Sequence, residues 1–205
     1  MSRVDVSEWK KSFSYKVVGS KGKMICIDPE TSKHCIVKFR WYVWDKLKRE
    51  TNTNDLNEKL TSEIYELIGL PHAKVRLGVF NGAKCAIIDF FCEDNDKTRA
   101  VHFGNSKNLR DLYTNISLLT LQGEENAIGK AFDMMLKVIK QECLGISDKN
   151  FEEVKTRFFE NVLGASLVEN WDLNIGNFAA IRNRVFRTYA LAPAFDTEKA
   201  FKKEM

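Results

Sequence analysis

The sequence predicts an α+β protein with two lobes, a small antiparallel sheet with one helix followed by a mainly helical part. Short apolar runs separated by turn residues occupy residues 13–39 and 74–91, with one segment of helical spacing between them. Beyond a polar stretch, apolar residues recur at helical spacing until Trp171. We therefore expect one lobe over residues 1–92 and a second over residues 93–205.

The first lobe is predicted from strand-like runs and one helix. The runs "FSYKVV", "MICID" and "HCIVKF" are separated by the turns "GSKGK" and "PETSK". The next segment has an apolar stripe at helical spacing, formed by Leu56, Leu60, Ile64, Leu67 and Ile68. We expect this stripe to face the sheet and the helix to end at Gly69 and Pro71. Two further runs, "KVRLGVF" and "KCAIIDFF", are joined by Asn81-Gly82, a strong hairpin signal.

The second lobe is predicted from two helical segments and a closing hairpin. The polar run of residues 92–108 has no hydrophobic period, and we interpret it as the connection between the lobes. Residues 124–145 and 151–171 carry apolar stripes at helical spacing. The runs "FAAIR" and "VFRTYALA" then predict a hairpin that turns at residues 182–184 and leads to Asp196.

The composition excludes several classes of function. The net charge of +4 comes from interspersed basic and acidic residues, which disfavours direct nucleic-acid binding. The five cysteines form no C-x-x-C pair, so we expect buried reduced thiols in place of disulfides or a zinc site. No run is long and apolar enough for a signal peptide or a membrane span, and the sequence predicts a cytoplasmic chain.

The stretch "ENWDLNIGN" and the later "APAFDTE" contain the polar residues that suggest chemistry. If the closing hairpin brings Asn177 and Asp196 together, their oxygen atoms suit Mg²⁺, which takes its other ligands from water and phosphates. Asp172 would then accept a proton from an attacking hydroxyl or orient it. The alternative is that Asp172 and Asn177 cap a helix end and a turn, which for an isolated D-x-x-x-x-N is the commoner case.

Lys38 lies in the otherwise apolar run "CIVKF", so its ammonium group must reach solvent or meet a buried anion. Glu63, in the helix of the first lobe, is the natural partner, although a solvated helix face is the commoner role of such a residue. The turn that contains Gly19, Lys21 and Gly22 offers backbone N–H groups that suit phosphates, or it is a simple hairpin turn.

The order of these parts is that of a bilobal protein-kinase-like fold. As in kinases that use ATP and Mg²⁺, the sequence contains, in this order, a glycine turn, a strand Lys, a helix Glu, two strands, helices, D-x-x-x-x-N and a final Asp. The sequence resembles the HipA-like kinases, bacterial Ser/Thr protein kinases that include the HipA toxins and the CtkA-type kinases. The resemblance runs from about Gly19 to Asp196 and is most specific in "LTSEIYELIGLPHAKVRL", "ENWDLNIGNFAAI" and "LAPAFDTE".

The resemblance implies a role for each matching position. Lys38 would bind phosphate with Glu63 as its partner, Asp172 would be the catalytic aspartate, and Asn177 and Asp196 would bind Mg²⁺. The residues that would face adenine are Ile88, Asp89, Phe90 and Phe91. Ser20 would be an autophosphorylation site in the glycine turn, beside Gly19, Lys21 and Gly22. The expected partners are a protein substrate with Ser or Thr and an antitoxin-type regulator.

Two other functions compete with a protein kinase. Relatives continue with further helices, whereas this sequence ends at Met205, which favours a nucleotide-binding pseudokinase or partner-binding module. Retention of the four polar residues Lys38, Asp172, Asn177 and Asp196 favours catalysis. A small-molecule phosphotransferase is the third alternative, but such enzymes usually have H-x-D where this sequence has Asn170-Trp171-Asp172.

Overall fold

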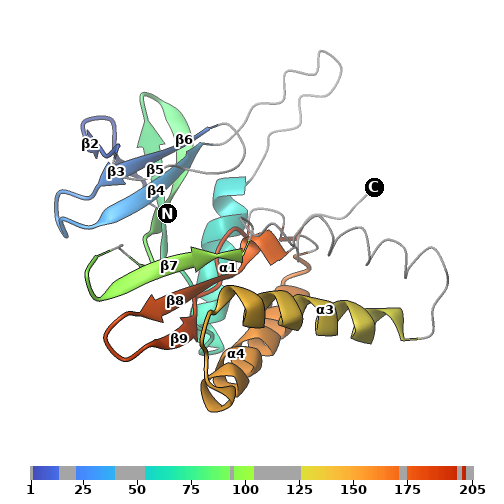
Figure 1. The fold of residues 1–205 in the computed structure, drawn as a ribbon. Coiled ribbons are helices and arrows are strands. Elements are labelled where there is room, and N and C mark those ends of the chain that lie inside the picture. The colour runs from blue at the N-terminus through green and yellow to red at the C-terminus, as the bar shows by residue number, and fades with distance from the viewer. Residues whose placement is uncertain are drawn as a thin grey trace. The chain divides into compact units, whose positions relative to one another are not determined.

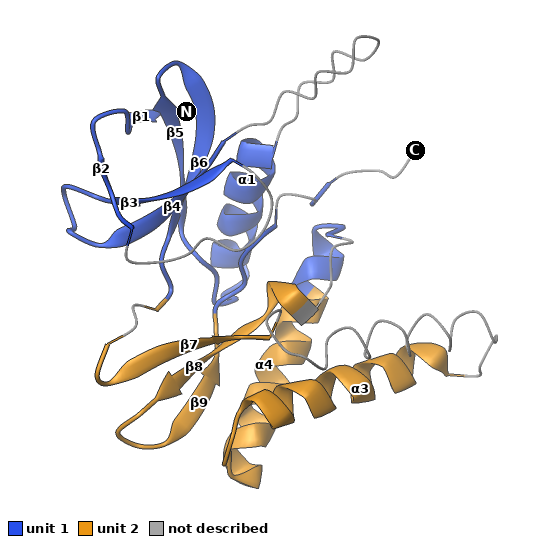
Figure 2. Cartoon of the chain, turned by 45° about the horizontal axis from the view of Figure 1, so that its top comes forward, with its two compact units in different colours: residues 1–91, 164–172, 193–205 blue, residues 92–163, 173–192 orange. Residues whose placement is uncertain are grey.

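The computed structural model of the chain describes residues 2–13, 22–39, 54–92, 95–103, 126–170, 175–197 and 200–201 (Figure 1). The chain forms two compact units (Figure 2). Unit 1 comprises residues 1–91, 164–172 and 193–205, and unit 2 comprises residues 92–163 and 173–192. Two late segments of the chain are thus grouped with the first part of the sequence.

Unit 1 is built on a six-stranded sheet with the order β1-β5-β6-β4-β3-β2. Its strands are β1 (Val4–Asp5), β2 (Lys10–Lys11), β3 (Lys23–Ile27), β4 (His34–Phe39), β5 (Val75–Phe80) and β6 (Ala83–Asp89). All neighbours pair antiparallel except β1 with β5. The predicted hairpin at Asn81-Gly82 is confirmed, with φ of 47° and 79° at its two central residues, as a two-residue hairpin loop requires.

Helix α1 (Asn54–Leu67) packs against β5 and β6, but with the face opposite to the predicted one. Its buried residues are Asn54, Asp55, Asn57, Glu58, Thr61, Ser62 and Tyr65. Leu56, Leu60 and Leu67 are 39%, 46% and 85% exposed, so the prediction that their stripe faces the sheet is wrong. The polar face is buried because its groups find partners there. Arg3 donates to Asp55 over 2.8 Å, and the hydroxyl of Ser62 donates to the carbonyl of Ala73 over 3.3 Å.

Alternation along the strands gives the sheet two apolar faces. One face contains Val6, Cys26, Cys35, Val37, Cys85 and Ile87. The other face contains Ala73, Val75, Ala86 and Ile88, with Ile36 and Phe195 packed against them. Burial raises the pKa of Cys35 and of Cys85 to about 12, so these thiols stay protonated at neutral pH. The expectation of buried reduced thiols is confirmed for four of the cysteines, while Cys92 is half-buried.

Unit 2 combines helices with a second sheet. Helices α3 (Ala127–Glu142) and α4 (Asp148–Leu167) are accompanied by β7 (Thr98–His102), β8 (Ala179–Asn183) and β9 (Thr188–Leu191), which pair in that order. The end of α4, from Gly164 onward, belongs to unit 1. The predicted hairpin is present as β8 and β9, but it turns at residues 184–187 and not at the predicted 182–184, because Arg182 and Asn183 still pair with Tyr189 and Thr188. Residues 92–108 are more than a connection, since β7 lies within them. The expectation of a mainly helical second part is therefore met only in part. The core contains Phe103, Ile139, Val154, Phe158 and Phe178.

Asp28 gives unit 1 a pH-dependent contribution to stability. Its side chain is 2% exposed and accepts from the backbone N–H of Glu30 over 2.8 Å and from Arg76 over 2.7 Å. Burial acts to raise the pKa of Asp28, but these hydrogen bonds and the charge of Arg76 lower it overall. The unfolded chain, with an Asp pKa of about 3.9, therefore takes up the proton first as the pH falls. The free energy of unfolding should decrease as the pH falls below about 4.

We expect Asp28→Asn to lower the free energy of unfolding by about 2 kcal/mol at pH 7, and by less at pH 3, where the wild type has lost part of this contribution. Urea unfolding at the two pH values measures both differences. Asp133→Asn is the control, because Asp133 is exposed in the middle of α3 and its substitution should leave stability unchanged. An Asp28→Asn deficit that is as large at pH 3 as at pH 7 would contradict the assignment.

Candidate functional site

Lys38 is the centre of a charged cluster within unit 1. The residue is 8% exposed, and its Nζ atom lies 2.6 Å from Oε1 of Glu58 and 2.5 Å from Oδ1 of Asp196. A buried anion, which is one of the two outcomes that its position in an apolar strand predicts, is therefore present as Glu58, and the partly exposed Asp196 is a second anionic partner. Lys23 is directly opposite Lys38 in the β3–β4 register, and its Nζ atom lies 3.6 Å from Oδ2 of Asp196. Two ammonium groups thus converge on one carboxylate.

Asp196 reaches Lys38 because the segment before it is fastened to the chain that follows α1. Ala194 forms a parallel bridge with His72, and its carbonyl accepts from the N–H of Ala73 over 2.9 Å. Phe195 then packs on the sheet face that contains Ile36. Asp196 itself has a φ of 60°, a left-handed conformation that costs free energy in a residue other than glycine. Such a conformation persists where its neighbours are firmly held.

Glu58 links α1 to strand β4 and to the residue that follows Asp196 through its buried carboxylate. Its side chain is 2% exposed, and Oε1 accepts from Lys38. Oε2 accepts from the backbone N–H of Thr197 over 3.2 Å and from the hydroxyl of Thr197 over 2.9 Å. A buried carboxylate is tolerated only when its charge is compensated and its lone pairs accept hydrogen bonds. Glu58 meets both conditions.

Glu63 is not the partner of Lys38. Its side chain is 39% exposed and pairs with Lys59 over 3.1 Å on the outer face of α1. The physical reason is helical geometry, since a step of five residues turns about 140° around the axis and moves the side chain to another face. The sequence signal for Glu58 was the polar stripe that it shares with Asn54, Thr61 and Tyr65 at helical spacing.

The charges around Asp196 favour its ionised form. Burial acts to raise the pKa of this carboxyl, but the positive charges of Lys38 and Lys23, and their hydrogen bonds, hold the pKa below its usual value. Asp196 is therefore a carboxylate at neutral pH. Its side chain is 26% exposed, more than that of Glu58, so the two anions differ in access to solvent.

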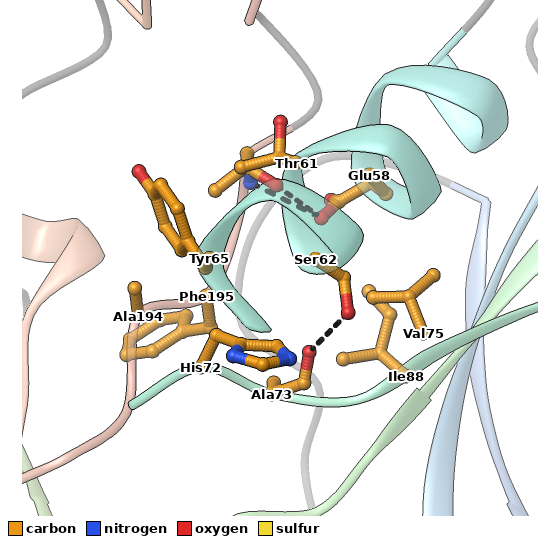
Figure 3. A pocket seen from close by; sticks show the side chains of 11 residues that line it. Glu58, Thr61, Ser62, Tyr65, His72, Ala73, Val75, Ile88, Ala194 and Phe195 are labelled. Atoms are coloured by element: carbon orange, nitrogen blue, oxygen red, sulfur yellow. Dashed lines mark hydrogen bonds between the residues drawn. The ribbon is translucent and has the colours of Figure 1, made fainter. Parts of the chain in front are cut away.

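A small pocket lies beside Glu58, between α1 and residues 72–75 (Figure 3). It has room for about one water molecule. Thr61 and His72 are among the residues that line it (Figure 3). Thr61 Oγ1 and His72 Nε2 are buried without hydrogen-bond partners. Because His72 Nδ1 lies 2.9 Å from the carbonyl of Leu70, which can only accept, that nitrogen is the donor.

The residues predicted to face adenine lie at the end of β6, in unit 1. Ile88 is 3% exposed and belongs to the core, and Asp89 lies 3.4 Å from Arg76. The ring of Phe90 lies near His34, and the ring of Phe91 stacks on Phe195 with centroids 5.2 Å apart. This stacking connects the end of β6 to the residue that precedes Asp196.

The other predicted positions are distributed as follows. Gly22 precedes β3, has a φ of 96° and accepts from the N–H of Phe39 over 2.9 Å. Asn177 ends the short 3-10 helix η2 (Ile175–Asn177) of unit 2 and is half-buried. Gly19, Ser20, Lys21 and Asp172 lie outside the described residues.

Neither a membrane span nor a self-sufficient metal cluster occurs among the described residues. No helix there is long and apolar enough to cross a bilayer. Within the same residues, no group of at least three His, Cys, Asp or Glu side chains gathers in a way that suits a metal ion.

Comparison with known proteins assigns the family. The sequence matches the HipA-like C-terminal domain over residues 15–203. The chain belongs to this family. A search of curated proteins gave no match. The family match nevertheless includes both ends of the Lys38–Asp196 contact and the whole of the HipA-like motif stretch at residues 169–177.

A solved structure supports the fold of this HipA-like chain. The Helicobacter pylori proinflammatory kinase CtkA matches with a TM-score of 0.68 and 17% identity, over 98% of this chain and 62% of that one. HipA from a Shewanella oneidensis complex with HipB and operator DNA matches with a TM-score of 0.44 and 12% identity, over 91% of this chain and 44% of that one. From the first of these matches, the chain has the fold seen in CtkA and spans less than two thirds of its length.

Proposed function

We propose that the chain is an ATP- and Mg²⁺-dependent Ser/Thr protein kinase of HipA-like type that is capable of autophosphorylation. The observation that supports this most is the buried Lys38, held between a helix carboxylate and the partly exposed carboxylate of Asp196. A strand lysine fixed by a helix glutamate is the device by which kinases hold a lysine against nucleotide phosphates. Family membership supports the same function.

The donor set around Lys38 fits a magnesium–nucleotide complex. Mg²⁺ is bound in phosphotransferases by one or two oxygen ligands of the protein and by substrate phosphates. Asp196 supplies an ionised, partly exposed carboxylate, and Lys38 and Lys23 supply positive charge next to it. Bound Mg²⁺ would neutralise charge on the transferred phosphoryl group. Lys38 would keep its orientation through Glu58 if a phosphate took the place of Asp196 as its second partner.

The remaining roles follow the family resemblance. Asp172 would accept the proton of the attacking hydroxyl or orient it, and Asn177 would provide the second oxygen ligand for Mg²⁺. The turn of Gly19, Ser20, Lys21 and Gly22 would cover the phosphates, with Ser20 as the autophosphorylation site. Residues 88–91 would face adenine. A Ser/Thr-containing protein is the proposed substrate, and an antitoxin-type chain is the proposed regulator.

Transfer of labelled γ-phosphate tests this function. We expect label from ATP to appear on Ser or Thr in the presence of Mg²⁺, either on the chain itself or on a generic protein substrate. Asp172→Ala should lower the rate by about 10²-fold or more, the usual loss when a positioned base is removed. Site mapping of the product would show whether Ser20 is modified. Equal label with wild type and Asp172→Ala would refute the proposed role of Asp172.

A further inference from the structure

Thr197 forms the last contact in a closed ring of interactions around Asp196. Glu58 Oε1 accepts from Lys38, and Lys38 donates to Asp196. Thr197, which follows Asp196 in the chain, returns to Oε2 of the same Glu58 through its N–H and its hydroxyl. Thr197 is 7% exposed, so these bonds are shielded from water. Dashed lines in Figure 3 mark the two bonds at the Glu58 carboxylate.

The ring restrains a backbone conformation that needs restraint. Asp196 has a φ of 60°, which a non-glycine residue keeps only when the surrounding structure determines it. On the N-terminal side, the bridge between Ala194 and His72 holds the chain. On the C-terminal side, the hydrogen bonds of Thr197 to Glu58 do so. Without the hydroxyl bond, the link from Thr197 to Glu58 would consist of the longer N–H contact of 3.2 Å.

We propose that the hydroxyl of Thr197 is a positioning group that fastens Asp196 to helix α1 and so orients its carboxylate for Mg²⁺. This inference rests on the proposed function, because it assigns Asp196 to the metal. It adds a link between the Glu58 carboxylate of α1 and Asp196, because one oxygen of Glu58 accepts from Lys38 and the other accepts from Thr197. Movement of α1 would thereby change the lysine and the metal ligand together.

Thr197→Val tests the inference, because valine keeps the shape and the backbone N–H but removes the hydroxyl. We expect about a ten-fold higher Mg²⁺ concentration for half-saturation of ATP binding, as expected if about 1.4 kcal/mol of a hydrogen bond to a charged group is lost. ATP binding without Mg²⁺ should stay unchanged. Exchange of the residue-197 amide hydrogen should be faster, and Thr197→Ser should restore both values.

Thr61→Val is the matched control. Thr61 is a buried threonine of α1 beside the same carboxylate, but its hydroxyl has no partner, so its removal should change neither value. If Thr197→Val and Thr61→Val have equal Mg²⁺ requirements while the wild type binds Mg²⁺ and ATP together, the inference is wrong and the proposed function stands. If ATP binding by the wild type does not depend on Mg²⁺, both the inference and the proposed function are wrong, even if Thr197→Val changes amide exchange at residue 197.

Discussion

Asp196→Asn is expected to abolish the Mg²⁺ dependence of ATP binding and to lower phosphoryl transfer by about 10²-fold or more. The substitution keeps the size of the side chain and one oxygen but removes the negative charge that a hard cation requires. Lys38 keeps Glu58 at 2.6 Å, so the cluster retains one full ion pair after the change. The loss should therefore appear in metal binding and turnover far more than in folding.

Calorimetric titration of ATP with and without Mg²⁺, combined with a transfer assay, measures the effect of Asp196→Asn. Asp133→Asn is a suitable control, because Asp133 is an exposed residue of α3 and should behave as wild type. If Asp196→Asn binds Mg²⁺ and ATP as tightly as the wild type does, Asp196 is not the metal ligand.

The second large effect is expected from Glu58→Gln. Removing one member of a buried ion pair costs about 3–5 kcal/mol. We expect about 3 kcal/mol here, the lower end of that range, because Lys38 retains Asp196 at 2.5 Å. The amide that replaces the carboxylate also cannot accept from both Lys38 and Thr197 with its two polar atoms, since its nitrogen is a donor. The KM for ATP should rise as Lys38 loses its orientation.

Glu63→Gln provides the matched control on the same helix. The Glu63 side chain is 39% exposed in an i,i+4 pair with Lys59, a type of contact that contributes about 0.3–0.5 kcal/mol. Urea unfolding and ATP kinetics of the two variants can be compared directly. A larger loss for Glu63→Gln than for Glu58→Gln would restore Glu63 as the partner of Lys38 and contradict the geometry.

Local signals allowed part of the fold and site to be predicted. The turn at Asn81-Gly82 was predictable because few residues accept the positive φ that a two-residue hairpin loop needs. The anion beside Lys38 was predictable because an ammonium group in an apolar strand needs compensation. Both arguments depend on one residue and its immediate sequence, without any knowledge of distant contacts.

Features that depend on distant partners were missed. The face that α1 turns toward the sheet is determined by hydrogen bonds from Arg3, Lys38 and Thr197 to its polar side chains. The apolar stripe had predicted the opposite face. Strand β7 was missed because its pairing partner, β8, lies far along the chain. The convergence of Lys23 on Asp196 depends on the β3–β4 register, which the sequence does not specify beyond the turn.

The central claim is that Mg²⁺ and the ATP phosphates bind at the Lys38–Glu58–Asp196 cluster. The most direct test replaces Mg²⁺ by paramagnetic Mn²⁺ with ATP and records the broadening of backbone amide signals, which falls steeply with distance from the ion. We predict the strongest broadening at Lys38, Asp196 and Thr197, and much weaker broadening at Val4–Asp5 in β1, three strands away from β4 in the sheet. Broadening centred elsewhere, with the signals of Lys38 and Asp196 unaffected, would contradict this account of the site.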